Sequence, residues 1–312
     1  MSGESSKSSG EYGEKIVKEL LSIMGWKCPV SNIDIACLLP DKHKIKDSLR
    51  TSHGIDNIFQ YHCPLRFGIQ QNVVISVKNY KNYPSKPISK LKNFLKDLDQ
   101  SLECFSLDSD WQSNIISTEI NDSCNWGVLF WLAYQESDPY EDLIIKIGDF
   151  NNTDDLSYEV VFIVDNRKAN FIYSSYTFAK ILFPNSSIEY YYPTTTYNIQ
   201  DAGRKNSGLL FPIQYIGSNI IPFKIMSDND SILLLTSIEA FTQDNLSKLL
   251  GLSQNFTTGW ATKIIIAFPD YHEQEHINVV NKAKLKFKDK NLSEQVSVKS
   301  YSRLNIKSLE EI

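Results

Sequence analysis

Hydrophobic positions along the first part of the chain recur with two periods, one typical of helices and one typical of strands. Helical spacing predicts a helix over residues 11–25, whose apolar face carries Ile16, Val17, Leu20, Leu21 and Met24. It predicts a second helix over residues 89–104, with Leu91, Phe94, Leu95, Leu98 and Leu102 facing inward. Short apolar runs predict strands at 33–39, 55–61, 73–77 and 126–134. The order helix, three strands, helix, strand indicates a mixed α/β fold.

The same alternation continues through the rest of the chain. Strands are expected at 143–147, 158–164, 188–192, 232–236, 263–268 and 295–301. Helices are expected at 170–182, 243–250 and 273–287, and polar connections at 106–123 and 198–208. We place a domain boundary near residue 150, which gives an N-terminal domain over 1–150 and a C-terminal α/β domain over 151–312.

The amino-acid composition excludes several classes of protein. The chain has 312 residues, of which 42% are hydrophobic, so it can bury a core and is not a mainly disordered protein. Its apolar runs are too short to cross a bilayer, and the polar residues 1–10 are expected to form a flexible tail rather than a signal peptide. Five scattered cysteines without a C-x-x-C pair argue against a disulfide framework and against a zinc ribbon. We expect a cytoplasmic protein with no membrane partner.

Charge is distributed unevenly along the chain. The net charge of −5 separates into +7 for residues 1–96 and −12 for residues 97–312. A basic segment of this kind is typical of a part that binds a polyanion, whereas the acidic remainder is better suited to a protein partner. Nucleic acid is therefore expected at the N-terminal part.

Three residues in the basic segment form a candidate catalytic set. Asp56 follows a glycine at the start of one predicted strand, Lys78 ends the next, and Glu14 lies on the preceding helix. Neighbouring strands can bring Asp56 and Lys78 to one end of a sheet. A carboxylate can hold a divalent metal that polarises a phosphate, and a nearby lysine can orient water and stabilise developing negative charge. The pattern favours phosphodiester hydrolysis.

At these positions the sequence resembles the PD-(D/E)xK, or restriction-endonuclease-like, nuclease superfamily. Glu14 matches the helix acid of that family, Asp56 the strand acid and Lys78 the lysine, and Lys78-Asn79-Tyr80 is similar to the ending found in its Mrr and Holliday-junction-resolvase branch. One residue departs from the pattern, because Ser76 stands where the family has an acid two positions before the lysine. Glu14 is the first choice as a substitute metal ligand, ahead of Asp97 and Glu103.

The resemblance implies a fold, an activity and partners. It implies an N-terminal mixed sheet flanked by helices, with Asp56 and Glu14 binding Mg²⁺ or Mn²⁺ and Lys78 acting at the phosphate. It also implies DNA as substrate, an endonuclease of bacterial antiphage defence, and a second subunit or homo-oligomer.

Other residues receive secondary roles in this interpretation. His53, Ser76 and Asn79 are candidate auxiliary residues, and Asp34 is an alternative strand acid. The lysines after the site are either a solvated face or a contact for the nucleic-acid backbone, and the candidates for such contact are Lys81, Lys86 and Lys90, followed by Lys92 and Lys96.

Two alternative functions remain at this point. Ser76 could mark an inactive nuclease fold that binds DNA or serves as an assembly scaffold. His272-Glu273-Gln274-Glu275-His276 also satisfies a zinc-hydrolase pattern, with Glu294 as the candidate third ligand. The C-terminal half weakly echoes the strand, helix and strand succession of the first, which suggests a degenerate nuclease-like unit used for assembly or sensing.

Overall fold

The computed structural model describes residues 2–116, 120–135, 138, 140–148, 150, 156–227, 230–257 and 259–311. The chain forms two compact units. Unit 1 comprises Met1–Ser22, Trp26–Ala169 and Ile306–Ile312, and unit 2 comprises Ile23–Gly25 and Asn170–Asn305. None of the helices in these ranges is both long and apolar enough to span a membrane.

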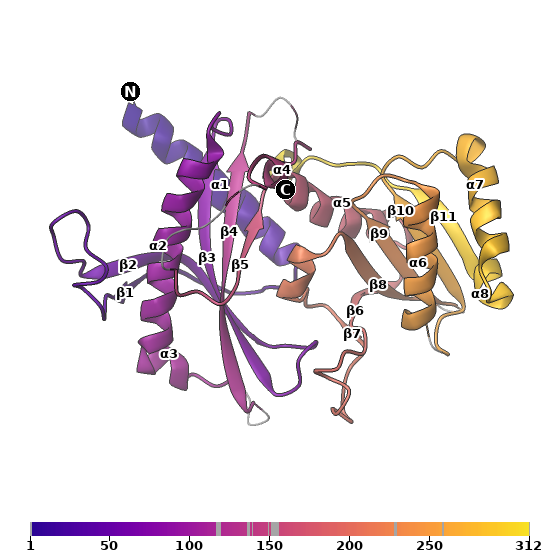
Figure 1. The fold of residues 1–312 in the computed structure, drawn as a ribbon, viewed down its shortest axis with the longest axis horizontal. Helices are drawn as coiled ribbons and strands as arrows, with labels where there is room; N and C mark the ends of the chain where they lie inside the picture. Colours follow the sequence, from indigo (N-terminus) through magenta and orange to yellow (C-terminus); the bar gives the residue numbers. More distant parts are fainter. Residues whose placement is uncertain are drawn as a thin grey trace. The chain divides into compact units, whose positions relative to one another are not determined.

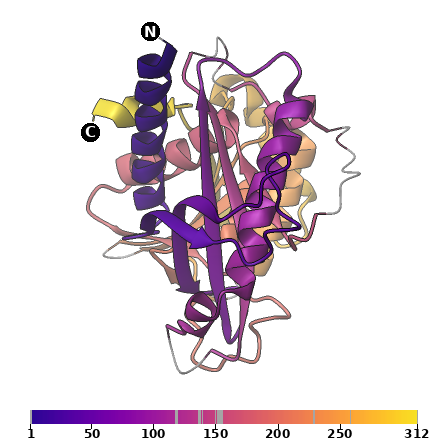
Figure 2. The ribbon, with the colours of Figure 1, turned by 90° about the vertical axis from the view of Figure 1, so that its left-hand side faces the viewer.

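Unit 1 is built around a five-stranded sheet in the order β1-β2-β3-β4-β5. The strands are β1 (Val30–Ala36), β2 (Ser52–His62), β3 (Ile69–Tyr80), β4 (Asp122–Ala133) and β5 (Val161–Val164). The first three strands are antiparallel, and β3, β4 and β5 are parallel. Figure 2 shows α1 (Ser2–Ile23) and α2 (Pro87–Leu107) on opposite faces of this sheet. The N-terminal domain is therefore a mixed sheet flanked by helices, as the sequence predicts.

The core of unit 1 follows the hydrophobic pattern of the sequence. Leu91, Leu95, Leu98 and Leu102 of α2 are buried against sheet residues that include Val74, Leu129 and Trp131. The five apolar positions predicted for the first helix are also buried. Burying a leucine side chain of this kind stabilises a fold by about 1.5–3 kcal/mol, so these faces fix both helices on the sheet.

Unit 2 contains a six-stranded sheet in the order β11-β10-β9-β8-β6-β7 (Figure 1). Its strands are β6 (Ser187–Tyr191), β7 (Ser207–Gly208), β8 (Ile220–Ser227), β9 (Asp230–Ser237), β10 (Lys263–Phe268) and β11 (Val296–Ser300). The helices α6 (Gln243–Phe256), α7 (Glu273–Lys286) and α8 (Lys290–Gln295) pack in one apolar cluster with β9 and β10. Helix α5 (Asn166–Leu182) precedes the sheet, and Thr236 of β9 donates a hydrogen bond to Ser175 of α5 at 2.9 Å.

The two sheets share one strand topology, apart from the additional edge strand β7 in unit 2. In unit 2, β6, β8 and β9 form an antiparallel meander, and β9, β10 and β11 are parallel. A helix precedes the meander and another connects its last strand to the parallel pair, so the order of elements matches that of unit 1. The echo between the two halves is therefore an architectural match.

Several expectations differ from the structure. Residues 143–147 are not a strand but contain helix α4 (Leu143–Lys146), because the Asp142 side chain caps the helix by accepting from Ile145 N at 3.1 Å. Residues 2–10 belong to α1 rather than to a flexible tail. The units divide at Ala169 rather than near 150.

The connections also differ in part. Strand β8 was not expected, and the predicted connection at 106–123 contains the short helix α3 (Ser109–Ser113), while residues 117–119 lie outside the described residues. Two 3₁₀ helices, η1 (Ile213–Gly217) and η2 (Ile306–Glu311), complete the set of described elements.

Candidate functional site

Strand β2 pairs with β1 along one edge, from Ser52 to Ile58. Along its other edge it pairs with β3, and this ladder begins only after Asp56, from Asn57↔Ile75 through His62↔Gln70. Strand β3 continues past this ladder and stays paired with β4 through Tyr80. The β2 and β3 strands therefore form a fork at Asp56, beyond which Ser76 to Tyr80 are paired on the β4 side.

The Asp56 side chain occupies this fork. Its Oδ2 atom accepts a hydrogen bond from Val77 N at 2.5 Å, in place of the next rung of the ladder between the strands. Asp56 is half-buried, as are Ser76, Val77 and Lys78. The structure therefore brings the strand acid within one residue of the lysine along β3, as the sequence predicts.

Lys78 extends toward helix α2. Its Nζ lies 6.0 Å from the ring centroid of Phe94, and alternation along the strand puts Ser76 on the same face as Lys78. Asn79 points to the opposite face, where it meets α1. The lysine is thus held beside an aromatic ring with its charge at the fork end of β3.

Glu14 lies on α1 beside the same end of β3. A methyl group at the preceding Gly13 would lie only 2.4 Å from Asn79 Cβ, so glycine permits a close crossing of helix and strand. The Tyr12 ring is 5.7 Å from the Tyr134 ring, which places this part of α1 next to the residue that follows β4. Glu14 is exposed and approaches from the α1 face, whereas Lys78 lies on the α2 face.

The other candidate acids have different neighbours. Asp97 accepts a hydrogen bond from Arg50 Nη2 at 2.9 Å, and Glu103 pairs with Lys42 at 2.5 Å and with His43 at 3.0 Å. Asp34 is an exposed residue of β1 that pairs with Gly54, and β2 separates it from β3. Of the candidate acids, Asp56 is the one whose carboxylate accepts a hydrogen bond from the fork end of β3, at Val77 N.

His53 is buried inside unit 1 rather than exposed at the fork. Its Nε2 lies 3.3 Å from His43 Nδ1. Burial lowers the pKa of His53 to about 4, and the positive charge of Arg50 acts in the same direction, so the imidazole is neutral near pH 7. A neutral, buried ring fits a role inside the fold better than contact with a phosphate.

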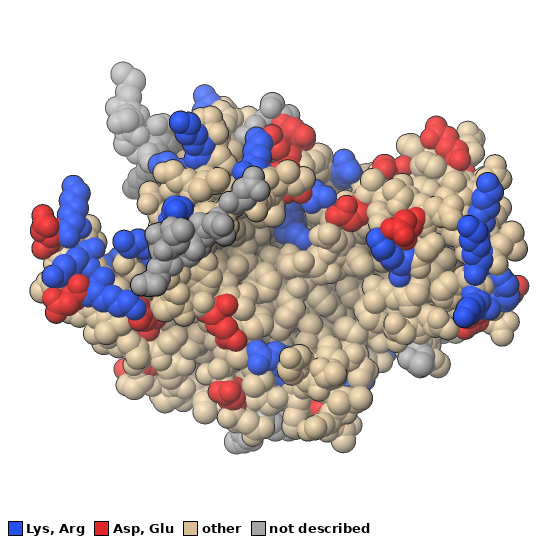
Figure 3. Space-filling model, in the orientation of Figure 1, with Lys and Arg blue, Asp and Glu red and all other residues tan. Residues whose placement is uncertain are grey.

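The candidate backbone-contact lysines are exposed. Lys81 follows β3, Lys86 precedes α2, and Lys90 lies in the first turn of that helix. Figure 3 shows Lys and Arg side chains gathered over this end of α2. The position is suitable for a phosphate backbone that leads into the fork.

The His272 and His276 pair has a local structural explanation. His276 Nδ1 accepts a hydrogen bond from His272 N at 3.0 Å, and its ring stacks on Phe241 at 4.5 Å. The two histidines belong to none of the metal-capable groups of three or more ligands within the described ranges. The zinc-hydrolase alternative therefore lacks a ligand set.

Comparison with known protein families supplies the decisive observation. The family model for the GAPS4 protein PD-(D/E)XK nuclease domain matches residues 1–168, more than half of the chain. The chain belongs to this GAPS4 nuclease family. Its nuclease domain ends one residue before the end of the main segment of unit 1, at Ala169. No curated protein and no solved structure matches the chain.

Membership of this nuclease family indicates what kind of chemistry the fork could support. PD-(D/E)XK nucleases generally use divalent metal ions, which take oxygen ligands such as carboxylates. Asp56 offers such an oxygen, because one carboxylate atom binds Val77 N and the other remains available for a cation. In this chain Lys78 lies near the end of β3, and Ser76 lies two positions before it, where a second strand acid is expected from the sequence resemblance.

One group of residues has no short signature in the sequence. Cys37, His43 and Cys104 lie around His53, although they are far apart in the sequence. No short motif contains all four residues. The only signal in the sequence is the presence of both cysteine and histidine in the same domain.

Proposed function

We propose that the chain is a metal-dependent deoxyribonuclease that acts in antiphage defence together with a second subunit or as a homo-oligomer. The observation that carries the proposal is the fork, where the Asp56 carboxylate binds Val77 N beside Lys78. The defence role is supported by the family resemblance alone.

The residues of the fork divide the chemistry between them. Asp56, assisted by Glu14, would hold Mg²⁺ or Mn²⁺, and such an ion supplies charge stabilisation at the phosphate and a more acidic bound water. Few protein ligands are needed, because Mg²⁺ keeps several waters and also binds phosphate oxygens. Lys78 stabilises the negative charge that develops on the phosphate, and Ser76 contributes at most through a water.

Charge supports DNA as the substrate. The fork and its lysines all lie in the segment of net charge +7. Lysine contacts to phosphates position a duplex without selecting sequence, so we propose cleavage without base recognition by this unit.

Salt dependence tests the lysine contacts. The triple variant Lys81→Gln, Lys86→Gln, Lys90→Gln should bind DNA more weakly and lose about 2–3 from the slope of log affinity against log salt, since each phosphate contact contributes about 0.9. The measurement is a DNA-binding titration at several salt concentrations. A matched control changes three exposed lysines of unit 2, Lys282, Lys286 and Lys288, and should leave the slope unchanged. Equal slopes for all proteins would contradict the contact.

A cleavage assay tests the function itself. Purified protein, alone and with the protein encoded beside it, is incubated with plasmid and phage DNA. We expect cleavage in Mg²⁺ or Mn²⁺, loss of cleavage in EDTA, and recovery when excess Mg²⁺ alone is added. RNA cleaved in preference to DNA would overturn the proposed substrate, and cleavage that persists in EDTA would overturn the metal requirement.

An inactive scaffold is the second candidate function, because Ser76 replaces the acid two residues before Lys78. DNA binding without cleavage under every condition, including with the partner, supports it.

For unit 2 we propose a degenerate nuclease-like unit for assembly. Its strand topology matches that of unit 1, but β8 and β9 pair continuously up to Ile220↔Ser237 without a fork, and β9 ends in Thr236 and Ser237 rather than in lysine.

A further inference from the structure

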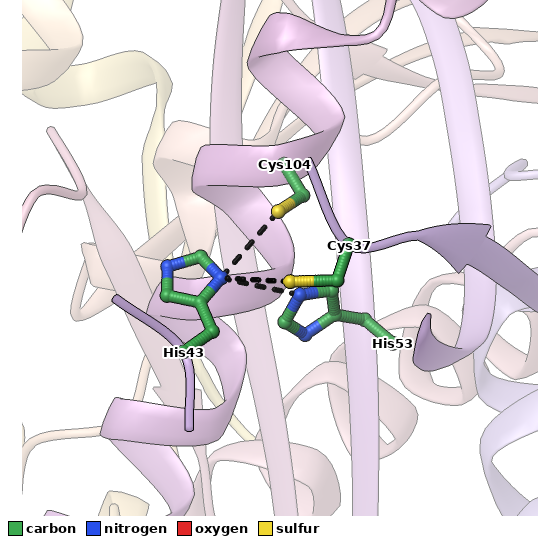
Figure 4. Close-up of side chains that lie close together, drawn as sticks. All are labelled: Cys37, His43, His53 and Cys104. Atoms are coloured by element: carbon green, nitrogen blue, oxygen red, sulfur yellow. Dashed lines mark hydrogen bonds between the residues drawn. The ribbon is translucent and has the colours of Figure 1, made fainter. Parts of the chain in front are cut away.

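Two cysteines and two histidines converge inside unit 1, and all of them are buried except Cys37, which is half-buried. Cys37 follows β1, His43 lies in the connection between β1 and β2, His53 is in β2, and Cys104 is in α2. One potential ligand atom from each of these residues lies within 4.8 Å of all the others. Figure 4 shows the four side chains pointing toward one another from these separate segments.

The distances fit a single tetrahedral ion. His43 Nδ1 is 3.5 Å from Cys37 Sγ, 3.5 Å from Cys104 Sγ and 3.3 Å from His53 Nε2. Tetrahedral zinc with bonds of about 2.3 Å to sulfur and about 2.0–2.1 Å to nitrogen separates N and S ligands by about 3.5 Å and two N ligands by about 3.3 Å. The three measured edges match this tetrahedron.

Hydrogen bonding alone accounts poorly for the cluster. His43 Nε2 lies 3.0 Å from Glu103 Oε2, and a carboxylate accepts, so Nε2 carries the proton and Nδ1 presents a lone pair. One lone pair accepts one strong hydrogen bond, yet three atoms approach it. A cation at the centre engages all four ligand atoms at once.

The surroundings of the cluster also suit a bound metal. Glu103 orients His43 through the ring nitrogen that faces away from the cluster, which is the usual arrangement of a metal-bound histidine. The amide of Leu38 donates to Cys104 Sγ at 3.4 Å, a contact that favours the thiolate form of the sulfur. These two contacts support His43 and Cys104 as ligands.

We propose that these four residues bind a structural Zn²⁺. The site is closed, because it has four protein ligands and no position for water, so the ion has a structural role rather than a catalytic one. It would fix the connection between β1 and β2 onto helix α2. Thiolate ligands select zinc over Mg²⁺ and Mn²⁺, so this ion is distinct from the metal proposed at Asp56.

Metal analysis of the full-length protein tests the site. Protein expressed in zinc-supplemented medium and purified without chelator should contain about one zinc per chain by inductively coupled plasma mass spectrometry. The Cys104→Ser and His43→Asn variants should lose most of this zinc. The matched controls Cys63→Ser, a buried cysteine outside the cluster, and His276→Asn should retain it.

A second measurement uses only wild-type protein, so it tests the site even if the variants fail to fold. Wild-type protein grown in cobalt medium should show the intense visible bands of tetrahedral Co²⁺ and a thiolate charge-transfer band, both displaced by added zinc. Removing zinc from wild-type protein with a thiol-compatible chelator should lower the Tm by about 5 °C or more, and zinc alone should restore it.

Three results would overturn the site. They are zinc-free wild-type protein that takes up neither Zn²⁺ nor Co²⁺, undiminished zinc in Cys104→Ser, and zinc lost in His276→Asn instead. All readouts are metal content, spectra and stability, so the outcome is independent of DNA cleavage.

Discussion

Asp56→Asn should lower the rate of DNA cleavage by about 10³-fold or more. Asparagine keeps an oxygen that can accept the hydrogen bond from Val77 N, so the fork should keep its geometry. It removes the negative charge that would hold the metal, and losing about 4 kcal/mol of charge stabilisation corresponds to a rate lower by about 10³-fold. Single-turnover cleavage of a labelled duplex measures the effect, and an unchanged Tm shows that the fold is intact.

Asp34→Asn is the matched control for this variant. Asp34 is an exposed acid on β1 and was the alternative strand acid in the sequence. The control should cleave DNA like the wild-type protein. If Asp34→Asn were inactive and Asp56→Asn active, the metal ligand would be Asp34 and the fork would not be the site.

Lys78→Met should lower the cleavage rate by about 10²-fold to 10³-fold. Methionine keeps an apolar chain beside Phe94, toward which the lysine extends, and removes the ammonium. An ammonium that stabilises developing charge or assists proton transfer is worth about 10²–10⁴ in rate. The affinity for DNA, measured in Ca²⁺ or without metal, should change little, because the loss falls on the chemical step.

Lys299→Met controls for the removal of a strand lysine. Lys299 is an exposed residue of β11 in unit 2, and its replacement should leave the cleavage rate unchanged. If Lys78→Met cleaved at the wild-type rate, the lysine of the motif would have no role in the chemistry. A loss of DNA affinity equal to the loss of rate would instead place Lys78 in substrate binding.

The matching topology of the two units has a consequence for the site. A helix, an antiparallel meander, a connecting helix and two parallel strands occur in each unit, yet within the part of the chain that the structure describes only unit 1 has a fork with an acid beside a lysine. The same arrangement of strands and helices can therefore occur with or without such a site, and the proposed function depends on a few residues at one strand end. Unit 2 keeps the layers of the fold with Thr236 and Ser237 at the comparable strand end.

Local patterns were sufficient for much of unit 1. The apolar faces of α1 and α2 were predicted from the helical spacing of hydrophobic residues, and the buried strands from runs of β-branched residues. These patterns are informative because burial of one face dominates the stability of each element. The sequence also predicted that Asp56 and Lys78 lie on successive strands. Neighbouring antiparallel strands bring such residues together whatever the details of the turn that joins them.

Helix capping and strand pairing explain two points where the predicted secondary structure was wrong. The run Leu143-Ile144-Ile145 favours a strand by composition, but Asp142 accepts from Ile145 N, and Asp165 accepts from Leu143 N at 3.0 Å. One cap lies next to the run in sequence, and the other comes from a residue 22 positions away. Strand β8, which contains Pro222, was missed because pairing with β6 and β9 stabilises it more than its own pattern indicates.

The sequence by itself determined the family of the nuclease, the mixed α/β layers of unit 1 and the acid and lysine of its candidate site. These properties depend on residue type and on spacing along one or two elements. The tertiary structure alone decided the fork at Asp56 and the cluster of Cys37, His43, His53 and Cys104. Both arise where segments distant in the chain pack together, and a fork or a four-ligand cluster has no short-range pattern, because its geometry is set by the strand ladder and the helix packed on it.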